Sequence, residues 1–169
     1  AWKLSSEGFH NVLALSGDYP IAGYGGVAAP VFDTDSVGLL RMLEDMNEGK
    51  GGAQERGEAP ERTRFYAGAV VTNHKRYERE VIPQYLKLRK KIENGARFVI
   101  NQIGYDARKD DELLRWMTLN GLDAPALANV YLLTPGTARV FNSGRIPGVV
   151  VTDALLAAVA PFLPMEIAP

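Results

Sequence analysis

The sequence predicts an α/β protein built from parallel βα units, and three observations predict it. Four short apolar segments, each of strand length, alternate with segments of helical periodicity, a pattern typical of parallel sheets with crossover helices. The second of these segments, residues 65–71, is apolar throughout, as expected for a strand covered on both faces. The chain has 169 residues, of which 46% are hydrophobic, which is ordinary for one domain or part of one.

The composition argues against several classes of function. A net charge of −1 gives no electrostatic reason to expect nucleic acid or an anionic membrane as a partner, and no apolar run approaches the ~18 residues of a membrane-spanning helix. The absence of cysteine excludes disulfides and thiolate chemistry and is compatible with a cytoplasmic protein. The two histidines, His10 and His74, lack the spacing of metal ligands, so no metal site is predicted.

The first strand supplies the first candidate site residue. Residues 2–8 read as the last turns of a helix that Gly8 ends, and the strand at residues 11–15 follows at once. Gly17 and Asp18 then close the strand at the end where parallel sheets bind ligands. Asp18 is therefore a candidate for the site, and a turn aspartate that satisfies its own loop is an equally good alternative.

The next segments contain a loop, a helix and a long connection. The loop at residues 16–34 is rich in glycine and could hold a phosphate, but it matches neither a P-loop nor a dinucleotide fingerprint. Asp33, Asp35 or Ser36 caps a helix that runs to about Asn47, with apolar residues at every third position. Residues 48–64, which are charged and rich in glycine, are predicted to form a flexible connection within the domain.

The middle of the chain carries two further strands and a basic helix. The strand at residues 65–71 ends in the polar tip Thr72, Asn73 and His74, and a helix follows over residues 75–94, with Pro83 at the first position of its main part. The basic cluster of this helix, which includes Lys91, is by default a solvated face. In the strand at residues 97–103, two amides, Asn101 and Gln102, either satisfy a buried network or hold a ligand, since an unpaired buried amide is costly.

The last third repeats the pattern once. Asp110 or Asp111 is predicted to cap a helix that Gly121 ends, a strand follows at residues 126–133, and Thr134 and Pro135 begin a short helix. Residues 148–151 could form a strand, but a helix over residues 150–160 is favoured. Four βα units suit either an open doubly wound sheet or half of an eight-stranded barrel, and length alone favours the open sheet because a complete barrel takes about 250 residues.

Four motifs carry a resemblance to a known family. They lie at residues 11–20 (Asn-Val-Leu-Ala-Leu-Ser-Gly-Asp-Tyr-Pro), 30–37, 88–102 and 129–133. Their order and spacing across about residues 1–155 resemble the methylenetetrahydrofolate reductase family. The most specific part is the series of Leu-x-Gly-Asp, which begins at Leu15, and Lys-x-x-x-Gly-Ala-x-x-x-x-x-Gln, which begins at Lys91.

The resemblance implies a (β/α)8 TIM barrel that binds FAD at its carboxyl face. The implied enzyme is cytoplasmic, transfers hydride from NAD(P)H to the flavin, and reduces 5,10-methylenetetrahydrofolate to 5-methyltetrahydrofolate for methionine synthesis. Residues 1–169 would then be a single, partial FAD- and folate-binding domain that supplies about strands four to seven. The family's catalytic acid, a glutamate on the first strand, would lie in a missing N-terminal portion, to which the start at Ala1 also points. Were these residues the whole molecule, a homo-oligomer of half-barrels or an open sheet would be expected.

The resemblance also assigns roles to individual residues. Asp18 would lie beside the flavin and the folate and stabilise the cationic iminium form of the substrate. Leu15, Ser16, Gly17 and Lys91 would contact the flavin, and Gln102 would contact the folate. Ser16 replaces an arginine of the family, Gln84 and Lys87 replace an aspartate and an asparagine, and the substrate-stacking phenylalanine is replaced near Pro135 or Gly136. Flavin binding then differs in detail, or the substrate is another folate or pterin. The alternative is a non-catalytic or methyl-transfer-associated folate- or pterin-binding module.

Overall fold

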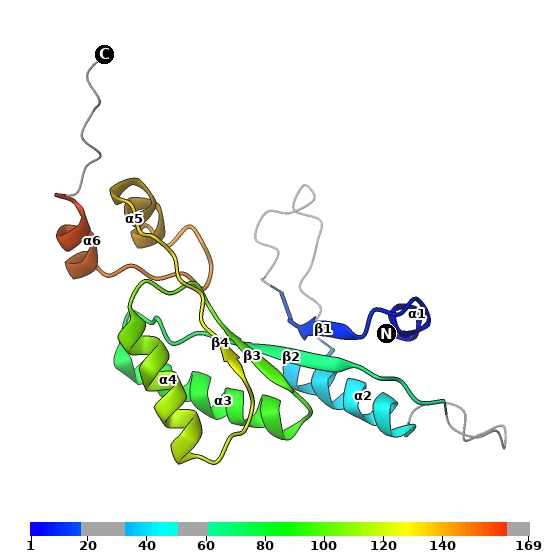
Figure 1. Ribbon diagram of the computed structural model, residues 1–169. Coiled ribbons are helices and arrows are strands. Elements are labelled where there is room, and N and C mark those ends of the chain that lie inside the picture. The colour runs from blue at the N-terminus through cyan, green and yellow to red at the C-terminus, as the bar shows by residue number, and fades with distance from the viewer. Residues whose placement is uncertain (18–32, 51–60, 162–169) are drawn as a thin grey trace.

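The protein contains a four-stranded, all-parallel sheet whose strands follow one another in the order of the sequence. In the computed structural model, which describes residues 1–17, 33–50 and 61–161, the sheet order is β1-β2-β3-β4 (Figure 1). The strands are β1 (Asn11–Ala14), β2 (Tyr66–Val71), β3 (Phe98–Asn101) and β4 (Ala126–Leu127). The prediction of parallel βα units is confirmed.

Helices alternate with these strands. They are α1 (Trp2–Ser6), α2 (Ser36–Glu48), the 3-10 turn η3 (Glu78–Glu80), α3 (Val81–Glu93), α4 (Ala107–Leu119), α5 (Pro135–Asn142) and α6 (Asp153–Val159). Helices α2, α3 and α4 line one face of the sheet, and α5 lies beside α6 beyond one end of it (Figure 1). Each of these helices connects two neighbouring parallel strands, and such crossover connections are almost always right-handed. Because the strands follow one another in sequence order, α2, α3 and α4 all lie on the same face of the sheet.

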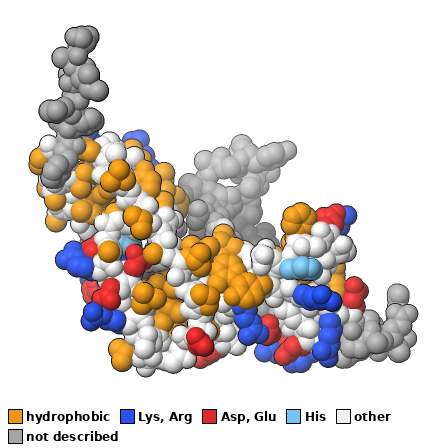
Figure 2. All heavy atoms as spheres, viewed as in Figure 1, with side chains coloured by type: hydrophobic (Ala, Val, Ile, Leu, Met, Phe, Trp, Pro, Cys, Tyr) orange, Lys and Arg blue, Asp and Glu red, His pale blue; other side chains and the backbone are white. Residues whose placement is uncertain are grey.

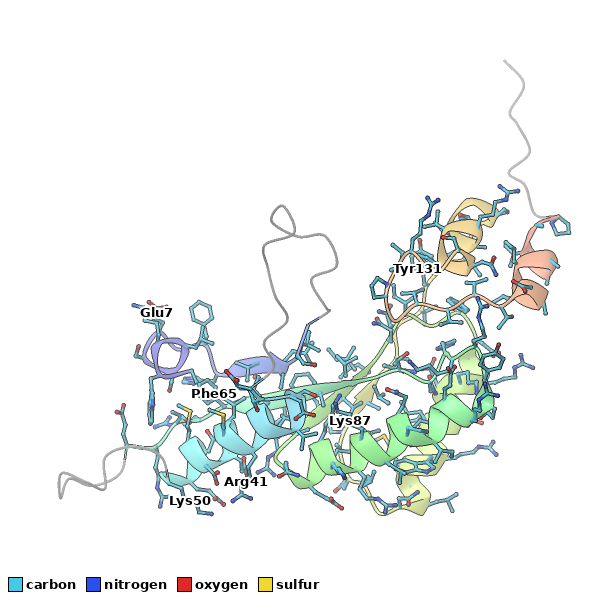
Figure 3. All side chains as sticks on the ribbon, turned by 180° about the vertical axis from the view of Figure 1, so that it is seen from behind. Glu7, Arg41, Lys50, Phe65, Lys87 and Tyr131 are labelled. Atoms are coloured by element: carbon cyan, nitrogen blue, oxygen red, sulfur yellow. The ribbon has the colours of Figure 1, made fainter. Side chains whose placement is uncertain are left out.

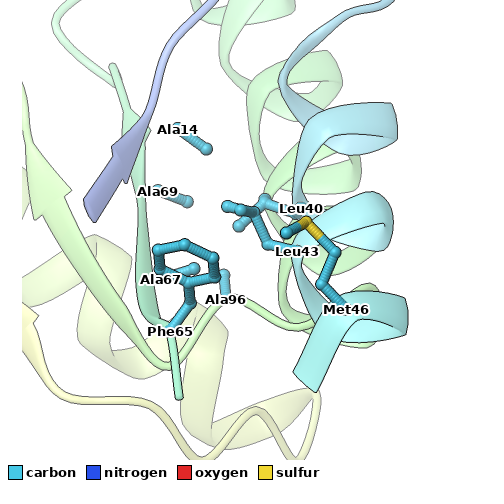
Figure 4. Close-up of a cluster of buried hydrophobic side chains, with 8 residues drawn as sticks. All are labelled: Ala14, Leu40, Leu43, Met46, Phe65, Ala67, Ala69 and Ala96. Carbon is cyan, nitrogen blue, oxygen red and sulfur yellow. The ribbon is translucent and has the colours of Figure 1, made fainter. Parts of the chain in front are cut away.

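The core lies between the sheet and these helices in two clusters. The first packs α2 against β1 and β2, where small alanines of the strands let the helix approach (Figure 4). Its buried members are Ala14, Leu40, Leu43, Met46, Phe65, Ala67, Ala69 and Ala96. The second packs α3 and α4 against β2 and β3, with Val71, Val81, Tyr85, Leu88, Val99, Leu113 and Met117 buried. Of the apolar positions predicted at every third residue of α2, Leu40, Leu43 and Met46 face the core, whereas Val37 at the start of the helix is half-buried and lies outside the cluster.

The opposite face of the sheet is apolar and carries no helix among the described residues. The register aligns Leu13, Gly68 and Phe98 on this face, and the Phe98 ring lies over Gly68 and stacks on Tyr66 with 5.5 Å between ring centroids. Leu13 is 38% exposed and Leu127 is 51% exposed. Figure 2 shows hydrophobic side chains gathered over the middle of the molecule in the view of Figure 1. The prediction that β2 is covered on both faces is therefore wrong for the described part of the chain.

Several element boundaries differ from prediction for local reasons. The strand predicted over residues 126–133 is shorter in the structure. β4 has two residues, and beyond it the parallel pairing among the described residues is limited to an isolated bridge of Val130 with Gly104, which follows the end of β3. Pro83 is the third residue of α3, not the first, which costs no hydrogen bond because first-turn N–H groups have no partner within a helix. The helix favoured near the C-terminus is α6, capped by Thr152.

The connection predicted over residues 48–64 is fixed at both of its ends. Glu48 is the last residue of α2 and Gly49 caps it in the left-handed region at φ 74°. At the other end, the side chain of Asn47 accepts hydrogen bonds from Thr63 Oγ1 and Phe65 N, both at 2.7 Å, and so holds the chain at the start of β2. Residues 51–60, like Asp18 and the glycine-rich part of the first loop, lie outside the described residues.

The cap of α4 is Asp106, not Asp110 or Asp111 as predicted. The helix begins at Ala107, and the Asp106 carboxylate accepts a hydrogen bond from the Arg108 backbone N–H at 3.0 Å. The Arg108 guanidinium also holds this carboxylate, which lowers the pKa of Asp106 to about 2. Three aspartates lie within the six residues 106–111, and the one that precedes the helix takes the cap.

We expect Asp106→Ala to lower the free energy of unfolding at pH 7 by about 1 kcal/mol, the usual value of an N-cap. Because the pKa of Asp106 is lowered on folding to about 2, this stabilisation is present above the unfolded-state pKa and is lost as the pH falls from about 4 toward 2. Urea unfolding of wild type and variant between pH 2 and pH 7 measures it. Asp111→Ala is the matched control, with a loss under about 0.5 kcal/mol, since Asp111 makes only an exposed ion pair with Arg115. An equal loss in both variants would contradict the assignment of the cap.

Candidate ligand-binding site

A cavity of about 470 Å³ opens at the carboxyl ends of β1, β2 and β3. This volume lies within the range of about 300–1,000 Å³ typical of small-molecule sites. Residues 15–17 follow β1, residues 70–72 end β2, and Gln102 follows β3. Further parts of the wall come from Ser36 of α2, Gln84 and Lys91 of α3, and the segment Pro147–Gly148. The strand ends therefore form a concave site at the end of the sheet where parallel sheets bind ligands.

Most of the site residues proposed from the sequence line this one cavity. They are Leu15, Ser16, Gly17, Lys91 and Gln102. Asp18 is the exception because it lies outside the described residues, directly after Gly17. The structure thus brings together residues that are up to 87 positions apart in the sequence, from Leu15 to Gln102.

Lys91 brings a partly buried cation to the cavity. Its Nζ donates a hydrogen bond to the backbone oxygen of Val70 in β2 at 2.6 Å. This bond holds the Lys91 side chain against the carboxyl end of the strand. Burial lowers the pKa of Lys91, and the positive charge of Lys87 lowers it further, while Asp35 raises it. Among the described residues Lys91 makes no ion pair. A ligand with an anionic or electron-rich group would therefore find a cation that no carboxylate has neutralised.

Lys87 does have a carboxylate partner. Its Nζ lies 3.0 Å from Asp35, the N-cap residue of α2, and both side chains are half exposed. Figure 3 shows Lys87 at the junction of α2 and α3. Hydrogen bonds from the first turn of α2, above all from Gly38, and the nearby Lys87 lower the pKa of Asp35. This ion pair connects α3 to the start of α2 beside the cavity. Lys87 itself does not line the cavity.

The two adjacent amides of β3 have different roles. Asn101 is 1% exposed and donates from Nδ2 to Asn73 Oδ1 at 3.1 Å and to Asp110 Oδ1 at 2.8 Å. Gln102 lines the cavity, and its Oε1 accepts a hydrogen bond from the Ile103 N–H at 3.0 Å, which leaves its amide nitrogen Nε2 toward Gly148. The sequence left open whether these amides satisfy a buried network or hold a ligand. Asn101 belongs to a network, and Gln102 is placed for a ligand.

The network around Asn101 joins the strand ends to α3 and α4. Asn73 donates to Tyr85 Oη at 3.0 Å and to the backbone oxygen of Lys109 at 2.5 Å. Tyr85 Oη in turn donates to Glu112 at 2.6 Å. Burial, followed by the hydrogen bond to Glu112, raises the pKa of Tyr85. No local sequence pattern indicates this role of Tyr85, because its partners Asn73 and Glu112 lie on other segments of the chain.

Thr72 lines the cavity, although no separate role is predicted for it from the sequence. Its Oγ1 is shielded from solvent and finds no hydrogen-bond partner among the described residues. Buried polar groups nearly always have a partner, so this hydroxyl is an exception, and because it has almost no accessible surface it is not itself exposed to the cavity. The available signal was its position as the first polar residue after β2.

Some of the positions at which this sequence differs from the methylenetetrahydrofolate reductase motifs that it resembles line the cavity, and others lie outside it. Ser16 and Gln84 line the cavity, whereas Lys87, Pro135 and Gly136 do not. Pro135 is instead the first residue of α5 and is buried. Tyr131, just before this helix, packs on Phe141 with 5.4 Å between ring centroids (Figure 3).

The part of the chain that the structure describes contains no group of three or more His, Asp or Glu side chains able to hold a metal ion. Within the same residues, every helix is too short or too polar to cross a membrane. No protein-family model matches the chain, and a search of curated proteins found no match. Function must therefore be inferred from the residues of the cavity and from the motifs.

Proposed function

We propose that the chain is part of a flavin-dependent reductase of the methylenetetrahydrofolate reductase type, which uses NAD(P)H to reduce 5,10-methylenetetrahydrofolate. The observation that carries this proposal is the single cavity lined by Leu15, Ser16, Gly17, Lys91 and Gln102. The resemblance assigns the first four to the flavin and Gln102 to the folate. These residues come from two strand ends and a helix, so their convergence supports one shared site.

The sheet supports the barrel that this proposal requires. A doubly wound sheet reverses its strand order and carries helices on both faces, whereas here the order is sequential and α2, α3 and α4 lie on one face. The uncovered apolar face around Leu13 and Phe98 suits the packed interior of a (β/α)8 barrel. Further strands, from a longer polypeptide or a second copy, would pair with the edges at β1 and β4 and close it.

The cavity residues fit a flavin in chemical type. Lys91 offers a cation for a pyrophosphate or an electron-rich ring, and Ser16 and Gly17 offer backbone. A bound flavin would supply hydride transfer between the nicotinamide and the folate. An anionic group beside Lys91 would offset the burial that lowers the pKa of Lys91, so binding would hold this side chain in its charged form.

Gln102 and Asp18 would act on the folate. Because the Ile103 N–H holds Gln102 Oε1, the amide orientation is set and Nε2 remains to donate to a ring acceptor of the substrate. Asp18 follows Gly17 directly, and the resemblance places its carboxylate where it would stabilise the iminium cation. Gln102 orients the substrate, and Asp18 supplies the electrostatic part of the reaction.

A folate- or pterin-binding module without hydride chemistry is the second candidate. Ser16 and Gln84 line the cavity where the family has an arginine and an aspartate, so two charged groups that face the cofactor in the family are replaced by neutral ones. Such a module would keep Gln102 and bind the pterin ring without a flavin.

One experiment separates the two candidates. We expect the purified full-length polypeptide, of which residues 1–169 are proposed to be part, to bind FAD, to lose its yellow colour under anaerobic conditions with NADH or NADPH, and to regain it on addition of 5,10-methylenetetrahydrofolate. Gln102→Leu should keep the bleaching step and slow the recovery of colour by at least about tenfold, since a hydrogen bond to the substrate is removed. A colourless protein that binds folate would support the module. Equal slowing of both steps in Gln102→Leu would contradict the role given to Gln102.

A further inference from the structure

The turn between α5 and α6 forms the part of the cavity wall that lies beside Gln102. Residues 146–149 have the sequence Ile-Pro-Gly-Val, and the Val149 N–H donates a hydrogen bond to the Ile146 oxygen at 3.4 Å across the turn. Gly148 has a φ of 75°. Proline followed by a glycine in the left-handed region is the signature of a type II turn, so the local sequence accounts for the shape of this wall.

The chain on both sides of this turn is anchored to the rest of the protein. After the turn, the side chains of Val149 and Val151 are buried. Asn142, the last residue of α5, donates from Nδ2 to the Val151 oxygen at 3.0 Å and to Asp153 Oδ1 at 2.7 Å, and so ties α5 to the start of α6. The tip of the turn is exposed and lines the cavity. The turn is therefore a fixed part of the wall.

Gly148 lies beside the amide nitrogen of Gln102. A Cβ added at Gly148 would lie 3.4 Å from Gln102 Nε2, and the Ile103 N–H holds Oε1 so that Nε2 is the atom on this side. Gly148 is exposed and Gln102 is half-buried, so a ligand in the cavity can reach both residues. The acceptor of an N–H···O hydrogen bond lies about 2.7–3.2 Å from the nitrogen. A methyl group on residue 148 would therefore take up space close to where such an acceptor must lie.

We propose that Gly148 is a specificity-determining residue, which leaves open the space beside Gln102 Nε2 for the edge of a flat heterocyclic ring. Because this part of the wall is backbone alone, a flat ring can lie against it and bring an acceptor on its edge to the amide. The pyrimidine ring of a pterin has this shape and such acceptors. The inference rests on the proposed function, which places the folate at Gln102, and it adds the wall that selects the ring.

Gly144 provides a matched control for the substitution of Gly148. It follows α5 closely and has a φ of 72°, but a Cβ added there would meet no described atom within 4 Å. Alanine is strained in the left-handed region at either position, whereas only Gly148→Ala places a methyl group beside the cavity. We expect Gly148→Ala and Gly144→Ala to lower the midpoint of urea unfolding by similar amounts, so that a difference in ligand binding reports the cavity and not the backbone strain.

The first measurement is the affinity of the full-length polypeptide for 5-methyltetrahydrofolate, the product of the proposed reaction, by titration calorimetry. We expect Gly148→Ala to bind it at least about tenfold more weakly than Gly144→Ala, since the methyl group displaces the ring from Gln102. Equal affinity in the two variants would overturn the role of Gly148 and leave the proposed function standing. A wild-type protein that binds no folate would overturn the proposed function and this inference together.

The second measurement tests the contact between the turn and the amide without any folate. The side-chain amide NMR signal of glutamine that disappears in Gln102→Leu belongs to Gln102. We expect Gly148→Ala to shift this signal, because its methyl group would lie against Nε2, and Gly144→Ala to leave it in place. A signal that Gly148→Ala does not move would overturn the proposal, since the turn would then not lie beside the amide. This result does not depend on the reductase reaction.

Discussion

Asn101→Ala is expected to lower the free energy of unfolding by about 3–5 kcal/mol. The substitution removes the amide that donates to Asn73 and to the carboxylate of Asp110, and it leaves a buried acceptor on Asn73 and a half-buried one on Asp110 without this donor. Each unsatisfied buried group costs about 1–3 kcal/mol, and more when charged, and the lost side-chain volume adds a cavity term. Urea unfolding at pH 7, followed by circular dichroism, measures the change.

Gln102→Ala is the matched control, one residue along the same chain. Its side chain accepts one hydrogen bond, from the N–H of Ile103, and otherwise faces the cavity. We therefore expect a loss of stability under about 1 kcal/mol together with a loss of folate affinity. Similar losses of stability in the two variants would show that Asn101 and Gln102 do not have the separate structural and binding roles that their contacts indicate.

Asn101 and Gln102 also show how much of the site can be predicted from the sequence. Successive residues of a strand point to opposite faces, yet the sequence left the same two roles open for both Asn101 and Gln102. Which of them faces the helices depends on the side on which α3 and α4 pack, and that is a property of the whole chain. The hydroxyl of Tyr85 illustrates the same limit, because its acceptor Glu112 lies 27 residues away on α4.

The number and order of the strands and helices could be predicted from the sequence more reliably than the residues at which they end. Apolar segments bounded by glycine and polar residues indicated all four strands and the helices between them, because that pattern is local. The length of β4 was overestimated because an apolar run such as residues 130–133 forms a strand only where a neighbouring strand pairs with it, and Val130 and Leu132 are both 88% exposed. The choice between a barrel and an open sheet likewise depends on strand order, which no local pattern contains.

Lys91→Met is expected to separate ligand binding from stability. We expect FAD to bind at least about tenfold more weakly, because a charge-assisted contact is worth about 1.5–3 kcal/mol. The free energy of unfolding should stay the same or rise by up to about 1 kcal/mol. Burial disfavours the charged form of Lys91 in the folded protein, and the hydrogen bond to the Val70 oxygen offsets only part of that cost. Titration of the apoprotein with FAD and urea unfolding measure the two effects.

The pH dependence of the free energy of unfolding gives a second, independent test of Lys91. Because the pKa of Lys91 is lowered on folding, the unfolded chain binds more protons between the folded-state pKa and the ordinary lysine value of about 10.4. The free energy of unfolding of the wild type therefore rises with pH through that window relative to Lys91→Met, in which the rise is absent. Lys90→Met is the control, since Lys90 is exposed and lies outside the cavity, and it should change neither FAD affinity nor this pH dependence. If Lys90→Met and Lys91→Met weakened FAD binding equally, the basic face of α3 as a whole, not the buried Lys91 ammonium, would be what attracts the cofactor.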